Sequence, residues 1–242
     1  MTDIFLAAGS IGSDLIALDK EWLLAVNGSD SLFLDRVAHV LTTALTWLPL
    51  YLSLLYIVIR NNENFRKVLC VLAGAGLCVL LAGSVDDMIV KPTVARWRPT
   101  HDPEIGLLVD IVDGYRGGNY GFFSAHAANT FSIAIYFCWL IRSRLLSTAL
   151  VIWSFTNCWT RLYLGVHFPG DILCGLLWGG VVGTGMWFLH QHIYKKINTQ
   201  DFYVSTQYTA TGYQKSDVDI VICILLLTIV YAILKSCYTL YI

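Results

Sequence analysis

Six long apolar segments dominate this chain, and their length restricts the folds that it can adopt. They lie near Val37 to Ile59, Val68 to Val90, Phe122 to Ile141, Leu145 to Val166, Ile172 to His190 and Val218 to Leu240. A helix needs about 20 apolar residues to cross the hydrocarbon core of a bilayer. Backbone groups inside a bilayer must satisfy their own hydrogen bonds, which excludes open strands. We therefore expect an all-α fold, a polytopic transmembrane helical bundle of about six spans.

The composition agrees with a membrane protein and excludes other classes. Of the 242 residues, 56% are hydrophobic and 14% are charged, and the mean hydropathy is +0.61, whereas soluble domains carry about 25% charged residues. The net charge is −1 with no long run of like charge, which argues against a nucleic-acid partner. The expected partners at this point are membrane lipids, and the sequence does not indicate an oligomeric state.

The chain divides into three expected regions: an interfacial segment at 1–36, a membrane core at 37–217 and a C-terminal transmembrane helix at 218–242. Residues 14–27 mix apolar side chains with Asp19, Lys20 and other charged residues, so they are too short and too polar to span. They suit an amphipathic helix on the membrane surface. Asp30 or Ser31 is expected to begin the next helix.

The short basic connections predict the orientation of the chain. Connections on one side carry Arg60, Arg66, Lys67, Arg142, Arg144, Lys195, Lys196 and Lys215. The other side carries an equal number of Lys and Arg, so the two totals do not determine the orientation. Half of the basic residues on this second side, however, lie in one long connection at 91–121. The turn from His167 to Gly170 has none. We expect both termini to be non-cytoplasmic, with the long connection and this turn opening on the same face.

The first polar cluster is KPTVARWRP, residues 91 to 99. Lys91 and Arg98 are seven positions apart, and on one helix they would share a face with about 10 Å between them along the axis. An ammonium group and a planar guanidinium together suit a phosphate group. The alternative is a basic pair that contacts lipid headgroups.

The second cluster is FFSAHAAN, residues 122 to 129, at the start of the third apolar segment. Ser124 and the first amides of this helix are placed to donate hydrogen bonds to an anion. His126 would lie beside that anion as a proton donor. Taken alone, a histidine near a membrane interface is more often structural.

The third cluster is TRLYLGVHFPGD, residues 160 to 171, between the fourth and fifth apolar segments. It contains Arg161, His167 and Asp171. An aspartate that accepts a hydrogen bond from one imidazole nitrogen leaves the other nitrogen free as a nucleophile. Alternatively, His167 and Asp171 could form half of a metal site, but the sequence has no HExxH motif and no cysteine ligands near them.

The order and spacing of these clusters resemble the type 2 phosphatidic acid phosphatase (lipid phosphate phosphatase) family, as a bacterial integral-membrane member. That family carries Lys, six residues, Arg-Pro; then Pro-Ser-Gly-His; then Ser-Arg, five residues, His, three residues, Asp. The first and third spacings match in full. Phe123, Ala125 and Thr160 stand where the family has proline, glycine and serine. None of these departures removes a titrating group, so we expect the chemistry to survive.

The resemblance implies a role for each matching residue. His167 would attack phosphorus to form a phosphohistidine, Asp171 would orient it, and His126 would protonate the leaving oxygen and later help to activate water. The residues implied in phosphate binding are Lys91, Arg98, Ser124, Ala125 and Arg161. No cofactor and no metal ion are expected.

The implied protein is an integral membrane phosphatase of the bacterial inner membrane, with its active site facing the periplasm. Its substrate would be a lipid-linked phosphate or pyrophosphate: undecaprenyl pyrophosphate, a lipid A phosphate or a phospholipid phosphate. One alternative is a phosphotransferase, which passes the phosphoryl group to an acceptor other than water. Another is a non-catalytic lipid-phosphate binder or transporter, which the three residues implied in catalysis argue against.

Polar residues in and beside the long connection, outside the three clusters, remain to be placed. Asp86 and Asp87, near the end of the second apolar segment, are expected to have a structural role, in which they pair with Arg96 or face water. The segment from His101 to Glu104 looks metal-like, but Pro103 within it favours a solvated loop. The glycine-rich stretch that ends in YRGGNYG suits a mobile cover, from which Arg116 and Tyr120 would contact the substrate.

Overall fold

The structure is a computed structural model that describes the backbone of residues 2–197 and 206–239, and side chains from residue 12 to 194 and from 206 to 239. Within these ranges all the regular elements are helical, and the strand pairing is limited to isolated bridges. The expected all-α fold is confirmed. The main helices are α1 (Thr2–Val26), α2 (Leu32–Thr42), α3 (Leu48–Arg60), α4 (Phe65–Val85), α5 (Lys91–Val94), α6 (Ala125–Ile141), α7 (Arg144–Tyr163), α8 (Pro169–Ile197) and α9 (Lys215–Tyr238).

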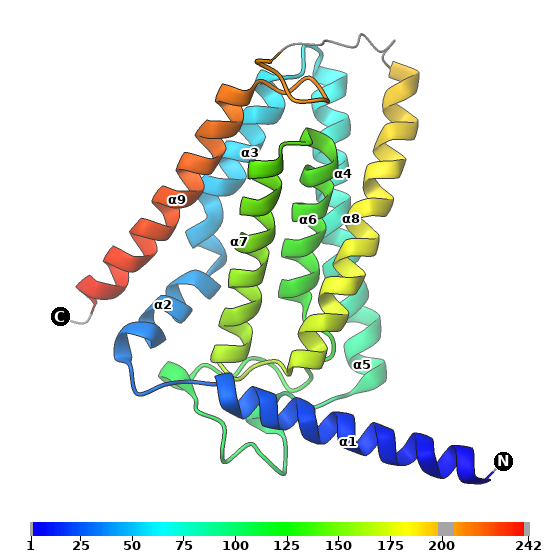
Figure 1. Cartoon of the computed structure of the whole chain (residues 1–242), viewed down its shortest axis with the longest axis vertical. Helices are drawn as coiled ribbons and strands as arrows, with labels where there is room; N and C mark the ends of the chain where they lie inside the picture. The colour runs from blue at the N-terminus through cyan, green and yellow to red at the C-terminus, as the bar shows by residue number, and fades with distance from the viewer. Residues whose placement is uncertain (1, 198–205, 240–242) are drawn as a thin grey trace.

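The long helices form a bundle, and α1 lies across one end of it (Figure 1). In the described part of the chain, three helices are long and apolar enough to cross a membrane: 65–94, 169–194 and 215–238. The bent pair of α2 with the segment Ala44–Arg60 adds a fourth if it counts as one span. The protein is therefore an integral membrane protein, while the expected count of about six spans stays a prediction.

The first expected span, Val37 to Ile59, is not one straight helix. It breaks after α2 at Thr42, continues as a 3₁₀ turn (Ala44–Trp47) and resumes as α3, with a bend of 69°. Pro49 lies in the first turn of α3, where its missing N–H costs little. Three side chains satisfy carbonyls at the break: Thr43 donates to His39, Thr46 to Val40 and Trp47 to Leu41.

The helix from α4 to α5 contains a π-turn from Asp86 to Val90. Helix α5 ends at Val94, because Ala95 adopts a left-handed conformation (φ 49°). The expectation that Lys91 and Arg98 share one helix face is therefore wrong. The chain turns between them, and Arg98 reaches the mouth of the bundle from an extended segment.

A row of glycines lets α8 approach α6 closely. A Cβ atom built at Gly175, Gly179 or Gly183 would lie 2.5–2.6 Å from a backbone carbonyl oxygen of α6 or its N-cap. Small residues spaced four apart allow such backbone contact between membrane helices. The contact fixes the start of α6 against the start of α8, where the N–H of Ser124 donates to the carbonyl of Asp171 over 3.0 Å.

The N-terminal segment forms a longer helix than expected. Helix α1 extends to Val26, exposes Leu15, Ile16 and Trp22, and packs the buried Leu23 beside Phe168. Ser31 caps α2 as expected. The division at 1–36, 37–217 and 218–242 stays a prediction. Residues 1, 198–205 and 240–242 lie outside the described residues, including the expected last span residue Leu240, as do the side chains of Lys195 and Lys196.

Candidate active site

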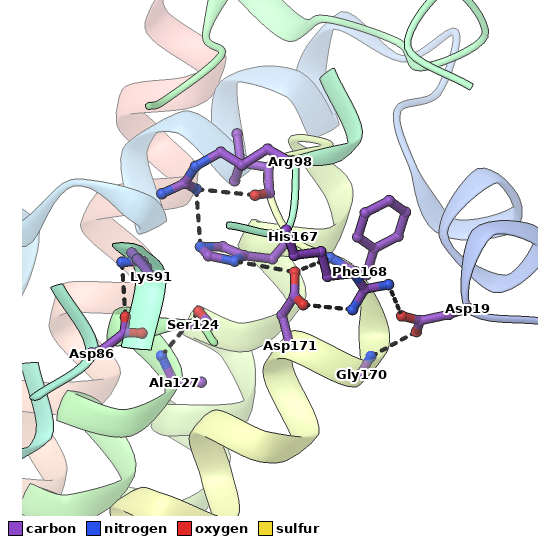
Figure 2. Close-up of polar contacts among 12 residues, drawn as sticks. Asp19, Asp86, Lys91, Arg98, Ser124, Ala127, His167, Phe168, Gly170 and Asp171 are labelled. Atoms are coloured by element: carbon purple, nitrogen blue, oxygen red, sulfur yellow. Dashed lines mark hydrogen bonds and ion pairs between the residues drawn. The ribbon is translucent and has the colours of Figure 1, made fainter. Parts of the chain in front are cut away.

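Residues of all three polar clusters converge at the end of the bundle that α1 crosses (Figures 1 and 2). Ser124 is the N-cap of α6, and Asp171 lies in the first turn of α8. Arg161 belongs to the last turn of α7, and His167 lies in the turn between α7 and α8. The expected shared face of the long connection and this turn is therefore present in the fold.

His167 lies between Arg98 and Asp171 and is 1% exposed. Its Nε2 atom is 3.0 Å from a guanidinium nitrogen of Arg98. Because a guanidinium group can only donate, Nε2 must be unprotonated and Nδ1 must carry the proton. Nδ1 faces Oδ2 of Asp171 over 3.6 Å, longer than a hydrogen bond, and such contacts often tighten only when substrate binds.

The environment of His167 favours its neutral form. Burial, followed by the positive charges of Arg98 and Arg161, holds the pKa of His167 well below its ordinary value. Both effects disfavour an added positive charge. A neutral imidazole with an unprotonated Nε2 has the lone pair that a nucleophile requires.

Two arginines supply positive charge around this imidazole. Arg98 and Arg161 are both buried, and the Nε–H of each has no hydrogen-bond partner among the residues that the structure describes. Arg161 donates to the hydroxyls of Thr42 and Tyr115. Burial and the nearby Arg161 lower the pKa of Arg98 from its ordinary value. Unpaired buried donors on two cations suit an anion with several oxygens, such as phosphate.

Lys91 is held by carboxylates at the edge of the site. Its Nζ atom lies 2.8 Å from Asp86 and 2.6 Å from Asp87. The expected pairing with Arg96 is therefore wrong: the π-turn brings Asp86 to Lys91, and Asp87 pairs with Lys91 across one helical turn. The alternative that these aspartates face water holds for Asp87, whose side chain is 63% exposed. Lys91 must leave at least one of them to contact a phosphate directly.

The N-terminus of α6 supplies the neutral donors. Ser124 is fully buried, and its hydroxyl accepts from the N–H of Ala127 over 3.4 Å. Ala125 is the first residue of α6, so its amide belongs to the helix end that attracts anions. His126 follows it in the same turn with an exposed side chain, and it lies close enough to His167 to influence the pKa of that residue.

Sequence reasoning missed two charged residues of this site. Arg96 donates to Oδ1 of Asp171 over 2.7 Å and to Oδ2 of Asp19 over 2.6 Å. Asp19 belongs to α1, far from the motifs along the chain, and no local pattern connects it to them. The only sequence feature that pointed to Asp19 was its charge within an expected amphipathic helix. Neighbouring residues of that helix are charged as well, so this feature did not single it out.

The remaining residues of the long connection are held by specific contacts. The N–H of Arg98 donates to Asn119 and the N–H of Gly121 donates to Arg96, so the glycine-rich stretch is hydrogen-bonded to the arginine segment. Tyr120 contacts Trp97, with 5.2 Å between ring centroids.

Two polar side chains at 101–104 bind the N-terminal helix. Asp102 and Glu104 lie 3.3 and 2.7 Å from Nζ of Lys20, and among the described residues no group of His, Cys, Asp and Glu is arranged to hold a metal ion. The segment that looked metal-like in the sequence is instead an anchor for α1. Arg116, the other expected substrate contact, is exposed.

An all-helical membrane bundle with two buried arginines around a neutral histidine has the features of an integral membrane phosphatase. The sequence model of the PAP2 superfamily matches residues 67–195, which include all three motifs. The chain belongs to the PAP2 superfamily and is a lipid phosphate phosphatase.

Two relatives are named as phosphatases of the same lipid. The lipid A 4′-phosphatase of Bacteroides thetaiotaomicron is 36% identical over 225 residues, which cover 90% of this chain and 97% of the relative. The lipid A 4′-phosphatase of Porphyromonas gingivalis is 30% identical over 171 residues, which cover 70% of this chain and 71% of that protein.

A solved structure shares the fold. It is the crystal structure of the first transmembrane PAP2 type phosphatidylglycerolphosphate phosphatase from Bacillus subtilis. It matches with a TM-score of 0.56 and 20% sequence identity, covering 82% of this chain and 94% of that chain. At this identity the likeness supports the membrane fold only.

Proposed function

We propose that this protein hydrolyses a phosphate ester of lipid A, through a phosphohistidine on His167, at the periplasmic face of the bacterial inner membrane. The observation that carries the mechanism is the position of His167, with Nε2 against Arg98 and Nδ1 facing Asp171. The substrate class is supported by the match to a lipid A 4′-phosphatase over 97% of that relative's length.

In the first step, Nε2 of His167 attacks phosphorus and the bond from phosphorus to the sugar oxygen breaks. His126 supplies the proton that the leaving oxygen takes up. Asp171 stabilises the positive charge that develops on the imidazole, because Nδ1–H faces its carboxylate. In the second step a water molecule attacks phosphorus, His126 accepts its proton, and the phosphorus–nitrogen bond breaks to release inorganic phosphate.

Phosphate binding requires Arg98 to change partners. Its guanidinium nitrogen contacts the lone pair of Nε2, so a phosphoryl oxygen must take over that N–H before His167 can attack. Arg161, Ser124 and the amide of Ala125 provide further donors, and Lys91 joins them when it leaves a carboxylate. Preorganised donors of this kind each contribute about 100- to 1,000-fold to rate, so the proposal requires no metal ion.

The periplasmic placement rests on the basic connections at the other end of the bundle. Arg60 ends α3, and Arg66 and Lys67 lie in the first turn of α4, so all three flank the connection between these helices. Arg142 and Arg144 lie at the turn from α6 to α7. Short loops rich in Lys and Arg stay cytoplasmic. A reporter fused after Ile242 tests this orientation: alkaline phosphatase is expected to be active there, and a fluorescent GFP fusion would contradict the placement.

Phosphate release by the purified protein tests the function. The panel contains lipid A, undecaprenyl pyrophosphate, phosphatidylglycerol phosphate and phosphatidic acid, each with and without EDTA. We expect lipid A to be the preferred substrate, EDTA to have no effect and His167→Ala to abolish release. His192→Ala is the matched control, because His192 is exposed on α8 away from the motifs.

Each outcome of this assay separates the candidate functions. Unchanged release by His167→Ala would contradict the phosphohistidine mechanism. Preference for another lipid would replace the substrate but keep the chemistry. Transfer of the phosphoryl group to an added alcohol, with little free phosphate, would identify a phosphotransferase, and binding without turnover would identify a lipid-phosphate binder.

A further inference from the structure

Helix α1 reaches the catalytic aspartate through a chain of three charged side chains. The carboxylate of Asp19, on α1, binds one nitrogen of the Arg96 guanidinium over 2.6 Å, and the other terminal nitrogen binds Oδ1 of Asp171 over 2.7 Å (Figure 2). A guanidinium that holds two carboxylates at once fixes their relative positions, since its donors lie in one rigid plane.

We propose that Asp19 and Arg96 are positioning residues, which hold the Asp171 carboxylate against Nδ1 of His167 for the phosphoryl transfer. The inference rests on the proposed function of His167. It assigns a part of the reaction to α1, a helix outside the stretch that the superfamily model matches.

The contacts of Asp171 show how Arg96 fixes the orientation of its carboxylate. The carboxylate is fully buried. Its Oδ2 atom accepts from the N–H of Phe168 over 2.9 Å and faces His167, while Oδ1 has Arg96 as its partner. Rotation of the carboxylate away from the imidazole would therefore break the bond with Arg96.

Arg96 is itself held on three sides. Its guanidinium carbon lies 4.2 Å from the centroid of the Phe168 ring, and its two terminal nitrogens bind Asp171 and Asp19. The two carboxylates and the guanidinium sum to a single negative charge. Without Asp19, the guanidinium would neutralise Asp171 more completely and weaken its attraction for a developing imidazolium.

Asp19 also anchors the turn that carries the nucleophile. Its Oδ1 atom accepts from the N–H of Gly170 over 2.7 Å, three residues after His167. A Cβ atom built at Gly170 would lie 2.9 Å from Oδ2 of Asp19, so the aspartate packs directly on this turn. One side chain of α1 thus touches both the turn with His167 and the arginine that holds Asp171.

The alternative is that α1 only needs to be attached to the bundle and has no effect on Asp171. A second ion pair of α1 provides a control for this alternative. Lys20, the next residue, forms ion pairs with Asp102 and Glu104. Lys20→Met removes a tether from the same helix without touching Arg96 or Asp171. If activity depended only on the attachment of α1 to the bundle, Lys20→Met would lower kcat as much as Asp19→Asn.

Substitution of Asp19 and substitution of Arg96 should shift the pKa of His167 in opposite directions. The charged and titratable groups around His167 are Lys91, Arg96, Arg98, Arg161, Asp19, Asp86, Asp171, Tyr115 and His126. Asp19→Asn removes a negative charge from this set, so we expect it to lower the pKa of His167 further. Arg96→Gln removes a positive charge and raises it.

The test measures kcat, KM and the pH profile of purified Asp19→Asn, Arg96→Gln, Asp19→Glu and Lys20→Met. We expect kcat to fall about 10-fold in Asp19→Asn and more in Arg96→Gln, because misplacement of a catalytic group by 1 Å costs up to about 100-fold. KM should hardly change, and Asp19→Glu should restore part of kcat. The acid limb of kcat should move to lower pH in Asp19→Asn and to higher pH in Arg96→Gln.

A spectroscopic measurement makes the result independent of turnover. In ¹⁵N-histidine-labelled protein, with His167 assigned by its loss in His167→Gln, the wild type should show the tautomer protonated on Nδ1. Asp19→Asn and Arg96→Gln should show a mixture of tautomers or a shifted titration, and Lys20→Met should match the wild type.

The outcomes separate this inference from the proposed function. Wild-type kcat, tautomer and titration in Asp19→Asn and Arg96→Gln, with an inactive His167→Ala, would overturn the inference and keep the function. Equal losses in Lys20→Met and Asp19→Asn would also overturn it, because α1 would then act as a tether only. If the wild type hydrolyses no lipid phosphate, the proposed function fails and the role in phosphoryl transfer falls with it, while the tautomer and titration of His167 still decide whether Asp19 and Arg96 hold Asp171 against the imidazole.

Discussion

Nε2 of His167 lies 3.0 Å from a guanidinium nitrogen of Arg98, so the residue proposed to bind phosphate also holds the lone pair of the proposed nucleophile. Arg98 donates in addition to the carbonyl of Val166 over 3.0 Å, in the residue before His167. Substrate phosphate would compete for the guanidinium and release the lone pair in the same movement. Binding and activation are thereby coupled through one side chain.

Replacement of Arg98 by lysine tests this coupling. One terminal nitrogen of Arg98 contacts both Nε2 and the Val166 carbonyl, and lysine keeps the charge but lacks the other guanidinium N–H donors that would bind phosphoryl oxygens at the same time. We expect kcat/KM to fall about 100- to 1,000-fold. Arg36→Lys is the control, because Arg36 forms an exposed ion pair with Asp113 and its substitution should leave kcat/KM unchanged. Near-wild-type activity of Arg98→Lys would show that charge alone suffices.

The lowered pKa of His167 predicts how acidification affects stability. Because the pKa in the folded protein is well below the ordinary 6.5, the unfolded chain binds a proton below pH 6.5 that the folded protein does not. The contribution of His167 to the free energy of unfolding is unchanged above pH 6.5. It falls by up to about 1.4 kcal/mol per pH unit below it.

Thermal unfolding of detergent-solubilised protein at pH 7.5 and pH 5.5 measures this effect. The melting temperature of the wild type should decrease more between these pH values than that of His167→Gln, which has no imidazole to titrate. Equal decreases in the two proteins would mean that His167 titrates alike in the folded and unfolded states.

Two glycines of the same loop predict opposite outcomes for alanine substitution. A Cβ atom at Gly121 would lie 3.0 Å from Cγ of Arg98 and 3.3 Å from Oδ2 of Asp171. Gly121→Ala is therefore expected to displace one of these groups and lower kcat by about 10-fold or more. A Cβ atom at Gly118 has no heavy atom within 4 Å, so Gly118→Ala should keep wild-type kinetics. Equal kinetics in both variants would contradict the close packing at Gly121.

The glycine row of α8 gives a matched pair for stability. In Gly179→Ala the new methyl group would lie 2.5 Å from the carbonyl oxygen of Ala128 on α6, and such overpacking costs about 1 to 3 kcal/mol. Gly185 lies two residues beyond the row, and a Cβ atom built there meets no heavy atom of the described residues within 4 Å. Thermal unfolding should show a lower melting temperature for Gly179→Ala and an equal or higher one for Gly185→Ala. The reverse order would contradict the contact between α6 and α8.

The sequence predicted the helical fold and the meeting of its motifs because both depend on local signals. Apolar length marks the helices, and the alternation of the expected spans brings Ser124, His167 and Asp171 to one end. The same signals missed the break after Thr42, although Pro49 and the neighbouring threonines belong to it. They also missed the left-handed Ala95, because a Lys-to-Arg spacing of seven fits a helix and a turn equally well.

The contacts that hold Asp171, the proposed catalytic aspartate, could not be predicted from the sequence for a physical reason. Asp19 and Arg96 meet across 77 residues, and Arg96 and Asp171 across 75. Such pairs depend on how α1 lies against the bundle, which neither periodicity nor motif spacing defines. The pairing of Lys91 with Asp86 was not predicted for another reason. The π-turn between these two residues changes which side chains share a helix face.

Trapping of the phosphoenzyme tests the central claim most directly. The purified protein would be mixed with ³²P-labelled lipid A, quenched within milliseconds in alkali and analysed by peptide mass spectrometry. We predict an acid-labile, alkali-stable phosphoryl group on Nε2 of His167 in the wild type, and none in His167→Ala. Full turnover with no label on His167, or with label on another residue, would contradict the proposed role of His167 as the nucleophile.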